Sequence, residues 1–199
     1  MITTTLNKIH AASPCTDGYK KLLKHLGKTK ADDDELPVLT VLESNGMDDA
    51  LWVLDNAVGN QYICRLFAAD CAERVLHLFE KERPDDTRAR DAIAVARNPD
   101  ASDEDMAAAW AAAWDDAWDD AWAAARGAAW DAARDAARGA AGADARDDAW
   151  DDARAAAWAA AWDDAWDDAW DDARGAQEKR LRQYLEHGEA AKDMAWDNG

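Results

Sequence analysis

The sequence has few of the features that mark secreted, membrane-spanning or disulfide-bonded proteins. It contains three cysteines, an odd number whose spacing matches no disulfide framework, and this indicates a reduced intracellular protein. The opening MITTTLNKIH lacks the apolar segment of a signal peptide, and no apolar run approaches the roughly 20 residues that a membrane span needs. We therefore expect a cytoplasmic protein that makes no contact with a membrane.

Signatures of catalysis are also missing. The sequence contains no Walker loop, no G-x-G-x-x-G, no G-x-S-x-G and no H-E-x-x-H, so the sites that these motifs build lack support. Carboxylates are abundant, but repeated Asp-Asp pairs lack the separate environments that acid and base roles require. Glu73, His77 and Glu80 share a helix face, yet no other segment repeats such a ligand pattern. We expect no enzyme, no cofactor and no metal ion.

Proline is scarce, and none interrupts residues 107–174, where one rule repeats through seventeen four-residue units. The third residue of every unit is alanine, and the fourth is tryptophan in ten units. Because alanine is the strongest helix former, this segment predicts helices, with breaks at Gly127, Gly139, Gly142 and Gly175. Each four-residue step turns the tryptophan stripe by about 40° round the axis, so these helices must be short, bent or wrapped by neighbours.

The other segments also predict helices, each ending near a proline, a glycine or a polar turn. They cover residues 4–12, 16–29, 31–46 with an acidic first turn, 47–60, 61–83, 87–97 and 177–187. A strand is the weaker option for residues 31–46, and no strand is expected elsewhere. The predicted fold class is all-α, with stacked helical hairpins and long Ala/Trp/Asp-rich helices in the C-terminal half. Three segments, packed as one domain, are predicted: a helical N-terminal region (1–100), the tetrapeptide-repeat helices (101–175) and a C-terminal helix with its tail (176–199).

Particular faces of these helices carry further predictions. The helix over 61–83 is predicted to be the central core helix of the first half, with inward positions Ile63, Leu66, Phe67, Cys71, Val75 and Leu78. The helix over 177–187 is predicted to present a basic face of Lys179, Arg180 and Arg182. Ser102 and Asp105 have the spacing of a capping box that opens the repeat.

The repeated tryptophans need a partner surface. A buried tryptophan removes roughly 150–250 Å² from water, whereas a soluble monomer rarely exposes an apolar patch larger than about 300–600 Å². The stripe is therefore predicted to lie in the core or in an interface between copies of the chain. The alternative is a ligand site, because indole faces stack on nucleotide bases. Its candidate residues are Trp158, Trp162, Arg154 and Arg174.

Basic residues are outnumbered, with 23 against 42 acidic residues and a net charge of −19. Residues 101–199 hold 10 basic and 25 acidic residues. This charge repels nucleic acid and favours basic partners. The candidate partner-binding residues are those of the Asp-Asp pairs: Asp115, Asp116, Asp119, Asp120, Asp163, Asp164, Asp167 and Asp168. Such pairs place one charge per roughly 3 Å of helix, close to the spacing of about 3.4 Å per phosphate of a DNA strand, so mimicry of DNA stays open.

Several segments outside the repeat carry a family resemblance: LNKIHAASPC (6–15), LLKHLGKT (22–29), ELPVLTVLESNGMDDALW (35–52) and RLFAADCAERVLHL (65–78). Together with the AAAWAAAW tail, they resemble the immunity proteins of the immunity protein 5-like family, which occur in bacterial and phage genomes. The resemblance covers nearly the whole chain. It implies a small cytoplasmic protein that neutralises a toxin or other effector by association, without catalysis, and it carries over no site residues.

Three hypotheses for the function follow from these observations. The first is an acidic, non-enzymatic immunity or inhibitor protein that binds a basic toxin or effector and does not itself bind nucleic acid. The second is a phage counter-defence protein that acts as a DNA mimic or as a sponge for a nucleotide signal. The third is a structural module whose tryptophan helices drive homo-oligomerisation.

Overall fold

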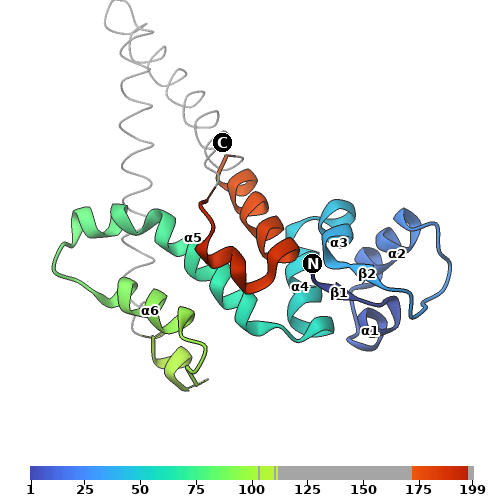
Figure 1. The fold of residues 1–199 in the computed structure, drawn as a ribbon, viewed down its shortest axis with the longest axis horizontal. Helices are drawn as coiled ribbons and strands as arrows, with labels where there is room; N and C mark the ends of the chain where they lie inside the picture. The colour runs from blue at the N-terminus through green and yellow to red at the C-terminus, as the bar shows by residue number, and fades with distance from the viewer. Residues whose placement is uncertain (103, 110, 112–171, 197–199) are drawn as a thin grey trace, which may run out of the picture. The chain divides into compact units, whose positions relative to one another are not determined.

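The structure, a computed structural model, describes residues 1–102, 104–109, 111 and 172–196 (Figure 1). The chain is all-α, as predicted, and the described residues add two very short strands. The predicted stack of long Ala/Trp/Asp-rich helices falls outside the described residues. None of the described helices is long and apolar enough to cross a lipid bilayer.

Internal contacts divide the chain into two compact units. The first unit comprises Met1–Ala72, Ala96–Ala101 and Ala176–Gly199, and the second comprises Glu73–Val95 and Ser102–Gly175. The first unit contains most of the described chain, and it contains the hydrophobic core, to which residues from Leu6 to Ala191 contribute.

The first two helices begin at side-chain caps. Helix α1 (Leu6–Ala11) begins at Thr5, whose hydroxyl accepts a hydrogen bond from the backbone N–H of Lys8. Helix α2 (Thr16–His25) begins at Cys15, whose Sγ accepts from the N–H of Gly18 at 3.3 Å. Such caps satisfy N–H groups that have no partner within a helix.

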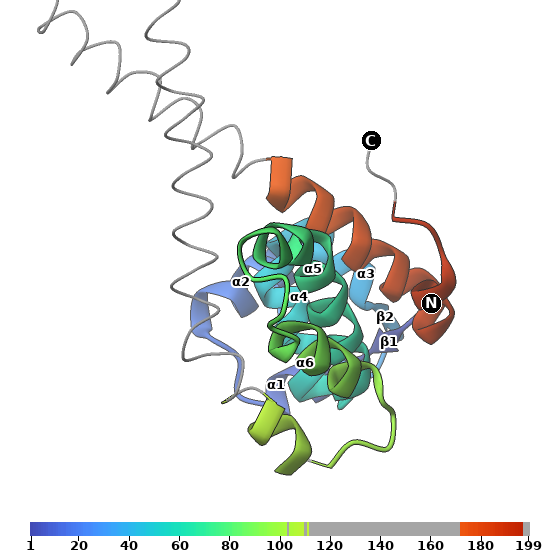
Figure 2. The same ribbon diagram turned by 90° about the vertical axis from the view of Figure 1, so that its left-hand side faces the viewer.

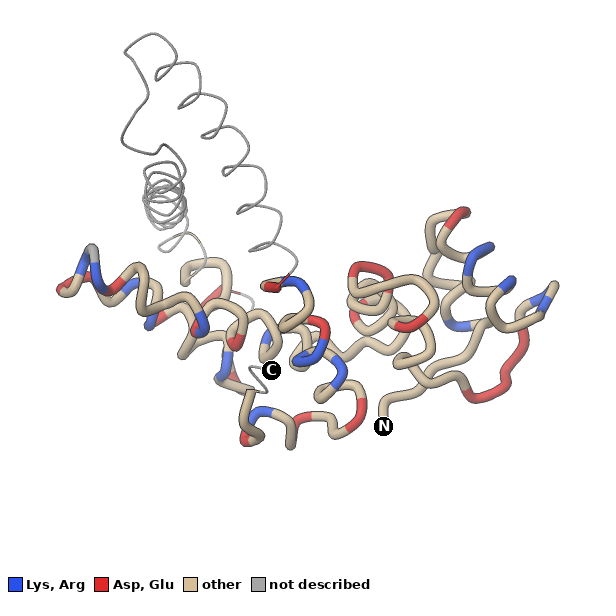
Figure 3. The backbone as a smooth tube through the Cα atoms, turned by 90° about the horizontal axis from the view of Figure 1, so that it is seen from above, with Lys and Arg blue, Asp and Glu red and all other residues tan. Residues whose placement is uncertain are grey.

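The next segment differs from its prediction. Helix α3 (Val38–Asn45) begins only after Pro37, and residues 31–35 do not form its first turn. Strand β2 (Leu36–Pro37) pairs antiparallel with β1 (Thr3–Thr4), so the expectation of no strand outside residues 31–46 was wrong. The strands form because two segments that are distant in the sequence pair with each other, and this pairing buries Leu36 and Thr4 beside the core. The acidic residues before β2 instead lie in the loop after α2, where Lys28 pairs with two of them (Figure 3).

The polypeptide turns sharply between the helices that follow. Helix α4 (Met47–Val53) starts after Gly46, whose φ of 100° only glycine adopts readily, and it continues as a π-helical turn η1 (Leu54–Val58). The predicted helix end at Asn45-Gly46 is thus confirmed. Helix α5 (Gln61–Glu82) follows.

The inward face of α5 agrees with its prediction only in the first unit. Ile63, Leu66 and Phe67 are buried, and Cys71 packs partly buried against the core. Val75 and Leu78, which were predicted to point inward, are 50% and 37% exposed. The helix passes from the first unit to the second after residue 72, and different residues are buried beyond that point.

In the second unit, α5 and α6 (Arg88–Arg97) are joined by an ion pair between Glu80 and Arg90. Phe79 of α5 and Ile93 of α6 are buried in this unit. The predicted capping box is confirmed, because the Ser102 N–H donates to Asp105 Oδ2 at 2.9 Å and the Asp105 N–H donates to Ser102 Oγ at 3.1 Å.

The C-terminal helix covers residues 172–187 and ends at Gly188, where a 3-10 turn (Gly188–Asp193) follows. The part of it in the first unit lies beside α5 (Figure 2). Its residues Leu181, Tyr184 and Leu185 are completely buried in the core. The carbonyl of Leu185 also accepts a hydrogen bond from the N–H of Ile2, so the C-terminal helix contacts the N-terminal segment in this unit.

Candidate binding site

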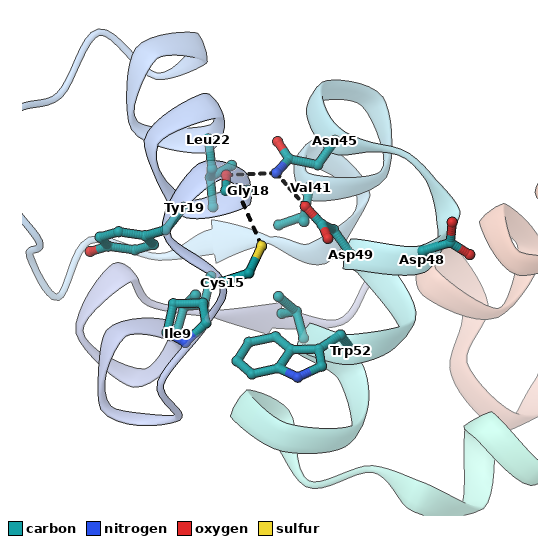
Figure 4. Close-up of a pocket in the computed structure, with 12 residues that line it drawn as sticks. Ile9, Cys15, Gly18, Tyr19, Leu22, Val41, Asn45, Asp48, Asp49 and Trp52 are labelled. Atoms are coloured by element: carbon teal, nitrogen blue, oxygen red, sulfur yellow. Dashed lines mark hydrogen bonds between the residues drawn. The ribbon is translucent and has the colours of Figure 1, made fainter.

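A pocket of about 290 Å³ opens between α1, α2, α3 and α4 in the first unit (Figure 4). Its walls are mainly apolar: Ile9, Pro14, Leu22, Val41, Trp52 and Val53. The remaining lining residues are Cys15, Gly18, Tyr19, Asn45, Asp48 and Asp49. Ligand pockets usually hold about 300–1,000 Å³, so this one is suited to a single side chain or a fragment rather than to a whole nucleotide.

Asn45 holds the polar side of the pocket together. As the last residue of α3, it donates from Nδ2 to the carbonyl of Gly18 in α2 at 2.8 Å and to Asp49 Oδ2 in α4 at 2.6 Å. These contacts bring Asp49 so close to α2 that a Cβ atom at position 18 would lie 2.6 Å from Asp49 Oδ2. Glycine at position 18 therefore leaves the space that the carboxylate occupies.

The two aspartates of the lining differ in their surroundings. Asp49 is half-buried and points toward Gly18 and Asn45, whereas Asp48 is exposed and points away from them (Figure 4). Among the described residues, Asp49 has the neutral amide of Asn45 as its partner and forms no ion pair. The lining contains no lysine, arginine or histidine, and the negative charge of Asp49 lies beside apolar walls without an ion pair among the described residues.

Cys15 places an exposed thiol in the same lining. Its position follows from its role as the N-cap of α2, because the cap geometry turns Sγ toward the first turn of the helix. Cys64 behaves differently, since burial, and then the charge of Asp55, raise the pKa of its thiol to about 11.

A second polar cluster in the first unit is buried and fully paired. Asp70, 3% exposed, accepts from Arg97 Nη2 at 2.7 Å, from Arg180 Nε at 2.8 Å and from the Tyr184 hydroxyl at 2.6 Å. The Arg180 guanidinium also lies over the rings of Tyr184 and Trp196. Burial, and then the hydrogen bond to Asp70, raise the pKa of Tyr184. This cluster joins α5, the end of α6 and the C-terminal helix, and its partners leave no open position for a ligand.

The cluster corrects one prediction. Arg180 was predicted to belong to an exposed basic face, but it is 3% exposed because it neutralises Asp70. The indole nitrogen of Trp196, whose ring lies under the Arg180 guanidinium, is also buried.

The histidine and carboxylate face of α5 forms no metal site in the part of the chain that the structure describes. His77 Nδ1 lies 3.1 Å from the carbonyl of Arg74, and Glu80 pairs with Arg90. Within residues 1–102, 104–109, 111 and 172–196, no three His, Cys, Asp or Glu side chains are grouped to hold a metal ion.

Most of the predicted site residues lie outside the described residues, so the structure places none of them: Asp115, Asp116, Asp119, Asp120, Asp163, Asp164, Asp167, Asp168, Trp158, Trp162 and Arg154. Arg174 is described and is exposed near the start of the C-terminal helix. Sequence reasoning missed the pocket. The sequence predicted helices over 31–46 and 47–60, and nothing in either segment showed that they meet α2.

Comparison of the chain with known protein families, with curated proteins and with solved structures found no match. The resemblance to the immunity protein 5-like family therefore stays a prediction.

Proposed function

We propose that this chain is a non-enzymatic inhibitor, of the immunity-protein kind, that neutralises a basic toxin or effector in the cytoplasm by direct binding. One observation carries the proposal: residues 73–95 and 102–175 contain 26 acidic and 11 basic residues, which is −15 of the net charge of −19. A surplus of one sign steers oppositely charged proteins toward the chain and speeds their association.

Two further features support this proposal. The family resemblance implies the same kind of function. The pocket of the first unit adds a negatively charged, partly apolar recess, of the kind that can anchor a basic side chain of a protein. Inhibition by binding requires no catalytic residues, so the acidic residues and the pocket are sufficient for the proposed function.

The test is capture of partners from a lysate of the native host on the immobilised full chain, followed by elution with rising salt. A basic protein is expected to elute as the salt rises, because the screening length falls from about 10 Å at 0.1 M to about 3 Å at 1 M. The captured protein must also lose its activity or toxicity when the purified chain is added in equal amount.

Matched variants separate charge from other causes. Replacing four acidic residues of the repeat by asparagine is expected to lower the salt concentration of elution: Asp163→Asn, Asp164→Asn, Asp167→Asn and Asp168→Asn. Replacing three exposed lysines of α2 by glutamine, at Lys20, Lys21 and Lys24, is expected not to lower it. If the captured protein elutes independently of salt concentration from the wild-type chain and from all of these variants, the proposal is refuted.

Other outcomes would favour the competing hypotheses. Release of a nucleotide when the purified chain is denatured would favour a sponge for a nucleotide signal. Displacement of the captured protein by DNA would favour mimicry of DNA. Light scattering that shows an oligomer, with no partner captured, would favour an oligomerisation module.

A further inference from the structure

We propose that the pocket between α1, α2, α3 and α4 receives one arginine side chain of the basic partner, with the Asp49 carboxylate as its ion-pair partner and Trp52 as the wall beside its guanidinium. This inference rests on the proposed function, and it adds a defined anchor point in the first unit to a chain that would otherwise attract basic proteins only by its overall charge.

Asp49 has no ion-pair partner among the described residues. A carboxylate that is partly removed from water is costly unless a cation or several donors compensate it. Asp70 and Asp86, both shielded, are compensated by arginines of the chain, whereas Asp49 receives a hydrogen bond from the neutral amide of Asn45. An ionised carboxylate has about four lone-pair positions, so Asp49 keeps acceptor capacity for a guanidinium.

The volume and lining of the pocket suit one long basic side chain. About 290 Å³ is at the lower limit for ligand sites, and apolar walls from Ile9, Val41 and Val53 match the methylene groups of a long basic side chain. The absence of a basic residue from the lining means that nothing there repels a cation.

The lining favours arginine over lysine. The planar guanidinium stacks on an indole and donates in a fork to a carboxylate, and it is more weakly hydrated than an ammonium group. Both an indole and a carboxylate line this pocket, at Trp52 and Asp49 (Figure 4). The expected order of binding is therefore arginine, then lysine, then an uncharged side chain.

Cys15 supplies a readout that does not require the partner. It is exposed and lines the pocket, so an occupant should shield its thiol from iodoacetamide. The probe is a capped Ala-Arg-Ala peptide, compared with capped Ala-Lys-Ala and Ala-Gln-Ala at the same ionic strength. Alkylation of each cysteine is followed by mass spectrometry of the full-length protein after digestion. Cys64, which does not line the pocket, is the internal control.

We expect the arginine peptide to slow alkylation of Cys15 in a saturable manner while the rate at Cys64 is unchanged. Asp49→Asn should weaken the apparent affinity by about tenfold or more, because a charge-assisted hydrogen bond is lost. The matched control is Asp55→Asn, which removes the same charge from a half-buried residue outside the lining and should leave the protection of Cys15 unchanged. Because Asp55 raises the pKa of Cys64, the rate at Cys64 is compared with and without peptide within the same variant. Trp52→Phe, which keeps an aromatic wall, should weaken protection less than Asp49→Asn.

Equal protection by the glutamine peptide, equal protection by the lysine peptide, or no protection at all would each overturn the inference. An Asp49→Asn protein that is protected like the wild type would do the same, provided that its urea denaturation midpoint is unchanged. The proposed function fails separately: it fails if the wild-type chain captures no salt-sensitive basic partner. If such a partner binds Asp49→Asn and Asp55→Asn equally, the function stands and the arginine anchor is wrong.

Discussion

Substitution of Asp70 by asparagine is expected to destabilise the first unit by about 3–5 kcal/mol, because it leaves a buried arginine without its anion. The Arg180 side chain is only 4% exposed, so water cannot replace the carboxylate that it loses. The Tyr184 hydroxyl loses its acceptor in the same buried place. Arg97 is 35% exposed and can be solvated, so its share of the loss should be small.

The measurement is urea denaturation of the full chain followed by far-ultraviolet circular dichroism, with comparison of midpoints at unchanged slope. Hydrogen exchange in peptides covering residues 61–72 and 176–187 should rise together, because the network joins these segments. Arg97→Gln should cost less than Arg180→Gln. The control is Glu43→Gln, which breaks an exposed ion pair to Arg182 at 3.1 Å and should cost less than about 1 kcal/mol. If Asp70→Asn costs no more than this control, the network does not hold the C-terminal helix to α5.

Three further predictions concern the same unit. Near neutral pH, iodoacetamide should modify exposed Cys15 well before Cys64, whose pKa is raised to about 11, and mass spectrometry of the digested protein checks the order; equal rates would contradict it. Gly18→Ala should change the unfolding free energy by no more than about 1 kcal/mol, since a gain in helix propensity offsets a clash with movable side-chain ends, yet it should displace Asp49 and abolish protection by the arginine peptide. Because the pKa of Tyr184 is raised above 10.0 by folding, the stability due to its neutral form is complete below that pH and is lost as pH rises toward the folded pKa. Urea midpoints across alkaline pH should therefore fall in the wild type and fall less steeply in Tyr184→Phe, and identical slopes would refute this assignment.

The sequence by itself determined the fold class and most helix boundaries, because these depend on neighbouring residues. The Ser102 and Asp105 capping box needs only a spacing of three residues, and it formed as predicted. The stop at Gly46 follows from a backbone conformation that glycine adopts at little cost. Periodicity likewise identified Ile63, Leu66 and Phe67 as buried residues of α5.

Tertiary structure decided the features that join distant segments. Arg180 has the pattern of an exposed basic residue, and only the approach of Asp70, 110 positions earlier, makes its burial favourable. The pairing of Thr3–Thr4 with Leu36–Pro37 is too short for any alternation pattern to signal. The pocket beside Asp49 likewise arises where α2, α3 and α4 meet at Asn45. Local propensity specifies which residues form helices, but the pairing of buried charges and the closure of a pocket depend on contacts whose energies exist only after the helices have packed.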